Sequence, residues 1–198
     1  MNKTVFILAA ALMASQSFAQ DGIRLGVPGY AGTGCPAGSA SAILSPDAQE
    51  LSILFSEYVA QAGGATRKQI DRKNCAIAVP VHVPQGYSVS VLQIDYRGYN
   101  ALPLGAKSTA TAEYFFAGTR GPLFRRDFVG PLDSDYTFTN RLIASAIVWS
   151  PCGAQVILRA NTAMTVQTNR LNQDAMATVD SADVSASLIY KLSWRRCF

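Results

Sequence analysis

The residues able to act as acids or bases are few and scattered. The 198-residue chain has a single histidine, His82. A catalytic histidine needs a nucleophile and an orienting acid, and the chain has no G-x-S-x-G sequence of the kind that presents a nucleophilic serine. His82 has a proline two residues away on each side, Pro80 and Pro84. We interpret it as an exposed strand residue that protects a sheet edge.

Carboxylates suggest two further kinds of chemistry. Asp133 and Asp135 are two residues apart, so an extended chain places them on one face, where they could supply oxygen ligands to Ca²⁺. Glycoside hydrolysis needs two carboxyl groups about 5–10 Å apart across the sugar. Turn-forming or solvated acids are the commoner explanation, so we expect no metal centre and no cofactor. The candidate acids for hydrolysis are Glu50, Glu57, Asp95, Glu113 and Asp127.

Basic and aromatic side chains are candidates for ligand binding. The basic residues between 67 and 73 follow a Gly-Gly pair and are typical of a solvated loop. A second basic group contains Arg120, Arg125 and Arg126, and such groups attract acidic polysaccharides, anionic lipids or nucleic acids. The net charge of +4 is too small to predict a nucleic-acid partner. Phe115 lies opposite the apolar stripe of its predicted strand, so we take Phe115, Arg125 and Arg126 as candidate binding residues.

Residues 1–19 predict a secretory signal peptide. Lys3 precedes an apolar run, Thr4–Met13, and Ser17 and Ala19 are the small residues expected before a cleavage site at Ala19–Gln20. Ten apolar residues are too few to cross a bilayer, which needs about 20. We expect a secreted mature domain, residues 20–198, in the periplasm or the extracellular medium. It has no transmembrane helix, and loss of Lys3 lowers the net charge from +4 to +3.

Export places the four cysteines in an oxidising compartment, where two disulfides are expected. None of them lies in a Cys-x-x-Cys pair, as zinc ligands commonly do. Three pairings are possible. We favour Cys35–Cys75 with Cys152–Cys197 because this pairing closes the two shortest loops.

Alternation of apolar and polar residues indicates strands along most of the mature chain. It is clear over Cys75–Pro84, Ala110–Phe116, Val156–Val166 and Val184–Trp194. In the first of these segments, prolines on the polar face predict an edge strand or a bulge. Between Val91 and Leu92 the apolar positions change parity, which predicts a β-bulge.

The pattern as a whole predicts one antiparallel β-sandwich, jelly-roll-like, disulfide-stabilised and with little or no helix. A composition of 49% hydrophobic and 15% charged residues excludes disorder. Leu142–Trp149 is apolar on both faces and predicts a central strand. Apolar residues at alternate positions form a stripe that ends at Phe198. Outer-membrane barrels have strands with an apolar stripe of this kind. Arg196 interrupts the stripe and four cysteines suit a disulfide-linked domain better, so the barrel is a minor alternative.

Leu51–Val59 fits two patterns. Ser45 could cap a helix with Pro46 at its first position, and apolar residues then recur at helical spacing from Leu51. Read as a strand, the same segment places alternate apolar residues inside. The local pattern favours the helix.

Six short motifs, in order, give the chain a resemblance to a secreted family, domain of unknown function 4360. They are YAGTGCP (30–36), RKNC (72–75), VPQG (83–86), YRGY (96–99), WSPCG (149–153) and WRRC (194–197). The resemblance covers about residues 29–197 and includes all four cysteines. It implies an all-β protein whose segment 51–58 is a strand, and this changes our prediction for that segment from helix to strand. It implies no activity, ligand or catalytic residue.

We therefore expect a secreted, non-catalytic module that binds a surface glycan or a protein, without nucleic acid as a partner. An acid-pair carbohydrate hydrolase is one alternative, so the question of enzyme activity stays open. A structural or envelope-associated protein is the other.

Overall fold

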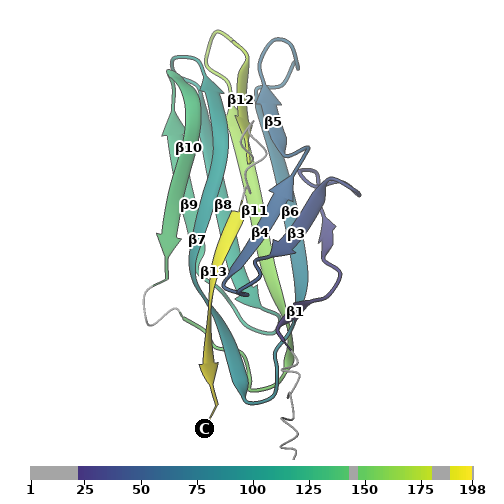
Figure 1. The fold of residues 1–198 in the computed structure, drawn as a ribbon. Helices are drawn as coiled ribbons and strands as arrows, with labels where there is room; N and C mark the ends of the chain where they lie inside the picture. Colours follow the sequence, from purple (N-terminus) through teal and green to yellow (C-terminus); the bar gives the residue numbers. More distant parts are fainter. Residues whose placement is uncertain (1–21, 143–146, 180–187, 198) are drawn as a thin grey trace, which may run out of the picture.

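The computed structural model describes residues 22–142, 147–179 and 188–197, and these form two antiparallel sheets (Figure 1). The predicted leader and its cleavage site lie outside the described residues. Sheet A contains β1 (Arg24–Leu25), β2 (Gly29–Ala31), β6 (Ile70–His82), β8 (Lys107–Phe116), β9 (Leu123–Val129) and β11 (Gln155–Gln167). Sheet B contains β3 (Ala40–Leu44), β4 (Glu50–Phe55), β5 (Val59–Ala62), β7 (Tyr87–Leu102), β10 (Leu132–Arg141), β12 (Ala175–Thr178) and β13 (Leu188–Arg196).

The strand order is that of a jelly roll. Eight strands (β4, β6, β7, β8, β9, β10, β11 and β13) form the two facing layers. Numbered one to eight along the chain, they follow the order 1-8-3-6 in sheet B and 2-7-4-5 in sheet A. The prediction of an all-β, disulfide-linked sandwich is confirmed, and the described residues contain no helix. No helix in that part of the chain is long and apolar enough to span a membrane.

Apolar residues on alternate positions of the two sheets form one core between them. β8 shows the pattern clearly, because Ala110, Ala112, Tyr114 and Phe116 are all buried. Sheet B contributes Tyr190, whose ring meets that of Tyr114 edge-on at 5.9 Å. Burial raises the pKa of several tyrosine hydroxyls and so keeps them neutral inside the core; they belong to Tyr58, Tyr96, Tyr114, Tyr136 and Tyr190.

The predicted bulge is present on β7. Lys191 lies opposite Gln93, whereas the next residue of β13, Leu192, lies opposite Val91. Leu92 is therefore the extra residue, and it accounts for the change of parity in the sequence.

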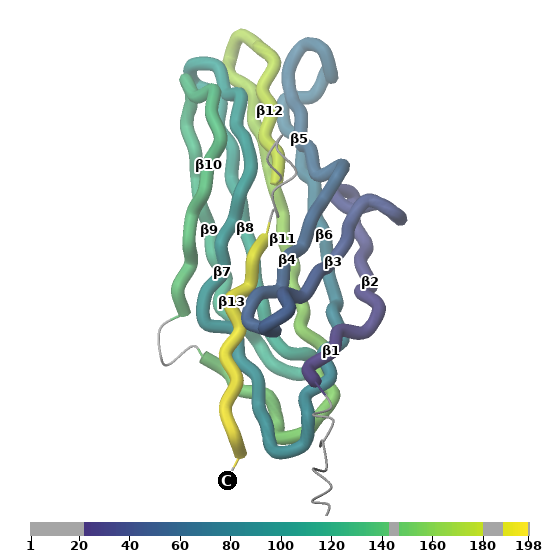
Figure 2. Tube along the Cα trace, viewed as in Figure 1, coloured from purple at the N-terminus to yellow at the C-terminus, as the bar shows by residue number. Residues whose placement is uncertain are grey.

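β6 is the second strand of its sheet, so the prediction that it forms an edge is wrong. It pairs with β11 along its whole length, and the short strands β1 and β2 cover its other side (Figure 2). The Pro80 carbonyl accepts a hydrogen bond from Gly26 on that outer side. The missing N–H of Pro80 therefore points to the same side, and no hydrogen bond to β11 is lost.

Two segments test the sequence predictions further. Leu51–Val59 lies in β4, a three-residue connection (56–58) and the start of β5, so the helix that the local pattern favours is wrong and the strand is right. Leu142 and residues 147–149 are not in strands, so the central strand predicted there is wrong for the described positions. Residues 143–146 lie outside the described residues, as do 184–187 of the last predicted strand.

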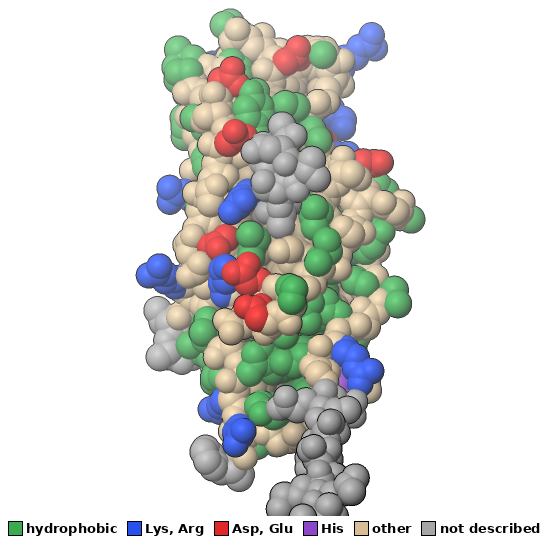
Figure 3. Space-filling model, in the orientation of Figure 1, with side chains coloured by type: hydrophobic (Ala, Val, Ile, Leu, Met, Phe, Trp, Pro, Cys, Tyr) green, Lys and Arg blue, Asp and Glu red, His purple; other side chains and the backbone are tan. Residues whose placement is uncertain are grey.

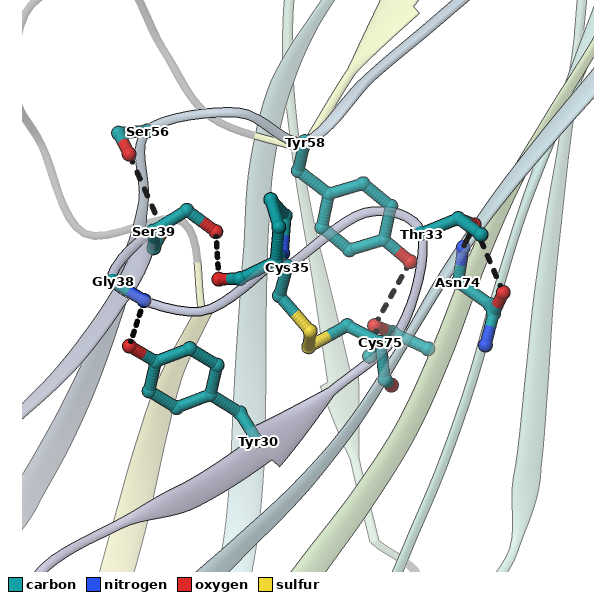
Figure 4. The surroundings of a disulfide bond; sticks show 11 residues. Tyr30, Thr33, Cys35, Gly38, Ser39, Ser56, Tyr58, Asn74 and Cys75 are labelled. Atoms are coloured by element: carbon teal, nitrogen blue, oxygen red, sulfur yellow. Dashed lines mark hydrogen bonds between the residues drawn. A yellow bond between two sulfur atoms is a disulfide. The ribbon is translucent and has the colours of Figure 1, made fainter.

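Both disulfides are the pairs that close the shortest loops. Cys35–Cys75 spans 5.5 Å between Cα atoms and Cys152–Cys197 spans 6.1 Å. The first bridge is fully buried beside the Tyr58 ring, whose hydroxyl is 3.0 Å from the Thr162 hydroxyl (Figure 4). It joins the loop after β2 to β6. The second joins the C-terminal end of β13 to the turn before β11.

Candidate functional site

The outer surface of sheet A carries many polar side chains, which together with Phe115 we call the polar face; exposed apolar residues lie around them, namely Ile70, Leu123, Val129 and Ile157. Strand alternation produces it, since the residues between them on β6, β8, β9 and β11 point into the core. The polar face consists of Arg72, Asn74, Lys107, Thr109, Thr111, Glu113, Phe115, Arg125, Asp127, Arg159, Asn161, Thr165 and Gln167.

The strand register brings residues of the polar face together from distant parts of the sequence. Asn161 lies opposite Glu113, and Thr165 lies between Arg72 and Thr109. Ala163 occupies the centre, between Asn74 and Thr111. Directly opposed Cβ atoms are about 5 Å apart, so these side chains can contact one ligand.

The polar face is hollowed at two adjoining places. One hollow, of about 330 Å³, includes Arg72, Glu113 and Asn161 in its lining, and small side chains such as Ala76 and Ala163 lie among them. The other, of about 400 Å³, lies over the ends of the strands that contain Lys107 and Gln167. Small side chains flanked by longer ones account for the first depression.

Part of the polar face is already paired. The Arg125 guanidinium donates hydrogen bonds of 2.8–3.1 Å to Asp127, which also accepts one from the Thr109 hydroxyl. The bonds from Arg125 hold the pKa of the Asp127 carboxyl below its usual range. Asn74 accepts a hydrogen bond from the Thr33 hydroxyl at 3.0 Å (Figure 4). These contacts fix Asn74 at the side of the first hollow, and Arg125 and Asp127 in the lining of the second.

Other side chains of the polar face are unpaired. Within the described ranges, Glu113, Asn161 and Arg72 make no side-chain hydrogen bond or ion pair. The Nε atom of Arg159 is buried and has no acceptor among the same residues. The side chains of Glu113, Asn161 and Arg72 are therefore available to a ligand.

The outer surface of sheet B differs, because its polar groups bind one another. Lys191 forms an ion pair with Glu50. The Asp95 carboxylate accepts hydrogen bonds from the Gln93 amide and the Thr139 hydroxyl, at 3.0 and 2.6 Å. Acidic and basic side chains lie beside each other on this surface (Figure 3). Arg97 is an exception, because its Nε has no acceptor among the described residues.

The structure places two of the three candidate binding residues on the same surface, about 14 Å apart by register. Phe115 and Arg125 both belong to the polar face, on β8 and β9. Arg126 alternates to the other side of β9, opposite Ala110, and is separate from them. Phe115 is half-buried and lies opposite Arg159 in the strand register.

The calcium candidates lie on the other sheet. Asp133 and Asp135 share the exposed outer surface of β10, and Asp133 accepts a hydrogen bond from the Tyr99 hydroxyl. That bond raises the pKa of Tyr99. The described residues contain no group of three or more side chains with metal-ligand chemistry. Ca²⁺ takes six to eight oxygen ligands, and this pair supplies few of them.

The candidate hydrolytic acids are far apart in the register. Glu113 and Asp127 lie on neighbouring strands but four residues out of register, which separates their Cα atoms by about 14 Å. Glu50 and Asp95 are separated by β13 and by about 12 Å, with Lys191 directly opposite Glu50. Glu57 lies in the bend after β4. His82 belongs to the outer side of β6, opposite Gln155 and Arg24.

Sequence reasoning missed Arg72, Glu113 and Asn161 as one cluster. A signal was present, because Arg159 and Asn161 are the outward polar positions of a strand whose other face is apolar. The missing information was which strands are neighbours, and that depends on long-range pairing.

Comparison with known proteins gives the family. The model of domain of unknown function 4360 (DUF4360) matches residues 21–197. The chain belongs to this family. An uncharacterized secreted protein of Arthroderma benhamiae is 36% identical to this DUF4360 protein over 169 residues, which are 85% of the chain and 69% of the relative. The predicted leader and this relative agree that the protein is secreted.

A solved structure of TmCBM61 in complex with β-1,4-galactotriose is also similar to this DUF4360 protein. The similarity covers 86% of this chain and 88% of the other, at 11% identity and a TM-score of 0.28. A score this low does not bear on what the DUF4360 protein binds.

Proposed function

We propose that this DUF4360 protein is a non-catalytic module that binds an extended glycan along the polar face. The observation that supports this most is the set of unpaired polar side chains around the first hollow, namely Arg72, Glu113 and Asn161. Unpaired donors and acceptors that already point outward gain hydrogen bonds from a ligand without breaking internal ones.

The chemistry of the polar face suits sugar hydroxyls. Each hydroxyl both donates and accepts a hydrogen bond, so it can donate to Glu113 and accept from Arg72, while the Asn161 amide can do either. Phe115 adds an apolar surface for the C–H side of a sugar ring. From Arg159 to Gln167, β11 advances by eight residue steps, about 27 Å, so the polar face can contact an extended chain.

The scaffold favours binding because it is rigid. Glu113 and Asn161 lie within long paired strands, and Asn74 is held through Thr33 next to the Cys35–Cys75 bridge. Fixed backbone positions and the held side chain of Asn74 reduce the conformational entropy that is lost when the ligand binds.

Replacement of Asn161 by alanine tests this proposal. We expect Asn161→Ala to weaken the tightest-bound member of a panel of neutral and acidic polysaccharides by about tenfold, which is about 1.4 kcal/mol. The reason is the loss of side-chain hydrogen bonds at the centre of the polar face. Isothermal titration calorimetry or affinity electrophoresis measures the effect.

The matched control is Thr137→Ala, an exposed position on the outer surface of sheet B with no side-chain hydrogen bond to the described residues. It should bind as the wild type does. If no glycan of the panel binds, or if Asn161→Ala and Thr137→Ala bind alike, the proposal is wrong.

A further inference from the structure

We infer that the glycan bound by the polar face is acidic and carries carboxylate groups at intervals along its chain. This inference rests on the proposed function and names the class of ligand.

The positive charge of the described residues is unevenly distributed between the two outer surfaces. Sheet A presents five basic side chains against two acidic ones outward, whereas sheet B presents four of each. Those of sheet A are Arg24, Arg72, Lys107, Arg125 and Arg159, with Glu113 and Asp127. Those of sheet B are Arg97, Arg141, Lys191 and Arg195, with Glu50, Asp95, Asp133 and Asp135. An anionic chain is therefore attracted to sheet A.

Three of the five cations on sheet A, Lys107 and two arginines, form no ion pair within the described residues. Arg125 is neutralised by Asp127, but Arg72 and Arg159 form no ion pair within the described residues. The buried Nε of Arg159 also has no acceptor there. Arg97 on sheet B has a buried Nε of the same kind, so the distinction of sheet A rests on its excess of positive charge. A ligand carboxylate would accept hydrogen bonds from the terminal N–H groups of the Arg159 guanidinium.

The positions of these arginines suit a chain that runs along the strands. Arg159 on β11 lies opposite Ala78 of β6, six residues from Arg72 on the same strand. The two guanidinium-bearing positions are thus about 20 Å apart along the sheet. Asn161 and Glu113 lie between them and can bind hydroxyls.

Glu113 and Asp127 favour this class of ligand over a more densely charged one. Both acids lie among the arginines of the polar face. Glu113 is unpaired and would repel a nucleic acid, which has a phosphate on every nucleotide, and equally a continuous layer of anionic lipid headgroups. Asp127 occupies the Arg125 guanidinium, which is then not free to bind a phosphate. A glycan with carboxylates at intervals can place neutral hydroxyls at these two side chains.

The test compares chains that differ only in charge. Polygalacturonate and alginate are each titrated into the secreted protein alongside their methyl-esterified forms. We expect at least one acid form to bind tenfold or more tightly than its ester at low salt, and the difference to shrink as salt is added. Arg159→Gln and Arg72→Gln should each remove most of this difference.

Arg141→Gln is the control, because it removes the same charge from the outer surface of sheet B. It should retain the preference, and the thermal midpoint of each variant verifies folding. Equal binding of acid and ester forms, or binding of neutral glycans alone, would overturn the inference but leave the proposed function intact. Equally tight binding of duplex DNA or anionic vesicles through the same arginines would also overturn it. Absence of binding to every glycan would instead refute the proposed function.

Discussion

Replacing Cys35 and Cys75 together by alanine is expected to destabilise the protein by about 4 kcal/mol or more. The bridge closes a 40-residue loop, and loop-closure entropy alone gives about 4 kcal/mol for this length. Both cysteines are almost completely buried, and the bridge packs against Tyr58, so the substitutions also remove core contacts. Urea unfolding of the variant and the wild type measures the difference in the free energy of unfolding.

The second bridge is the internal control. Cys152–Cys197 closes a loop of similar length, 45 residues, but Cys152 is exposed. Removal of the Cys152–Cys197 bridge has a similar entropic effect but loses fewer core contacts. It should therefore destabilise the protein less than removal of Cys35–Cys75. A larger loss from the exposed bridge would contradict this view of the core.

Tyr190→Ala is expected to reduce the free energy of unfolding by about 3–5 kcal/mol, the usual range for a large core aromatic. Tyr190 is fully buried in sheet B, and its ring contacts Tyr114 of sheet A edge-on. Tyr190→Phe should change stability by no more than about 1 kcal/mol, because the hydroxyl has no hydrogen-bond partner among the described residues. Thermal and urea unfolding measure both variants. If Tyr190→Phe, which removes only the hydroxyl, destabilised the protein as much as Tyr190→Ala does, the hydroxyl would have a hydrogen-bond partner.

Much of the fold was predictable because its determinants are local. Alternation of apolar and polar residues predicted the long strands of sheet A, and the change in parity of the apolar positions at Leu92 predicted the bulge. The segment 51–59 shows the limit. Its helical spacing and Ser45–Pro46 start are genuine local signals, but tertiary pairing of β4 with β13 and β3 decides the structure.

The candidate site was only partly predictable. Phe115 and Arg125 could be selected because each has a local signal in the sequence. Phe115 is an aromatic residue opposite the apolar stripe of its strand, and Arg125 belongs to a cluster of basic residues. Asn161 and Glu113 become neighbours only through the pairing of β11 with β8, strands about 50 residues apart in the chain. The separation of Arg126 from Arg125 follows from strand alternation, once the segment is known to be a strand.

An NMR titration with an oligosaccharide released from the tightest-binding glycan tests the central claim most directly. The account predicts that the largest shifts occur at the side-chain amides of Asn161 and Asn74 and at the backbone of β6, β8, β9 and β11. Residues of β4, β10 and β13 should shift little. Shifts concentrated on sheet B or on the end loops would contradict the account.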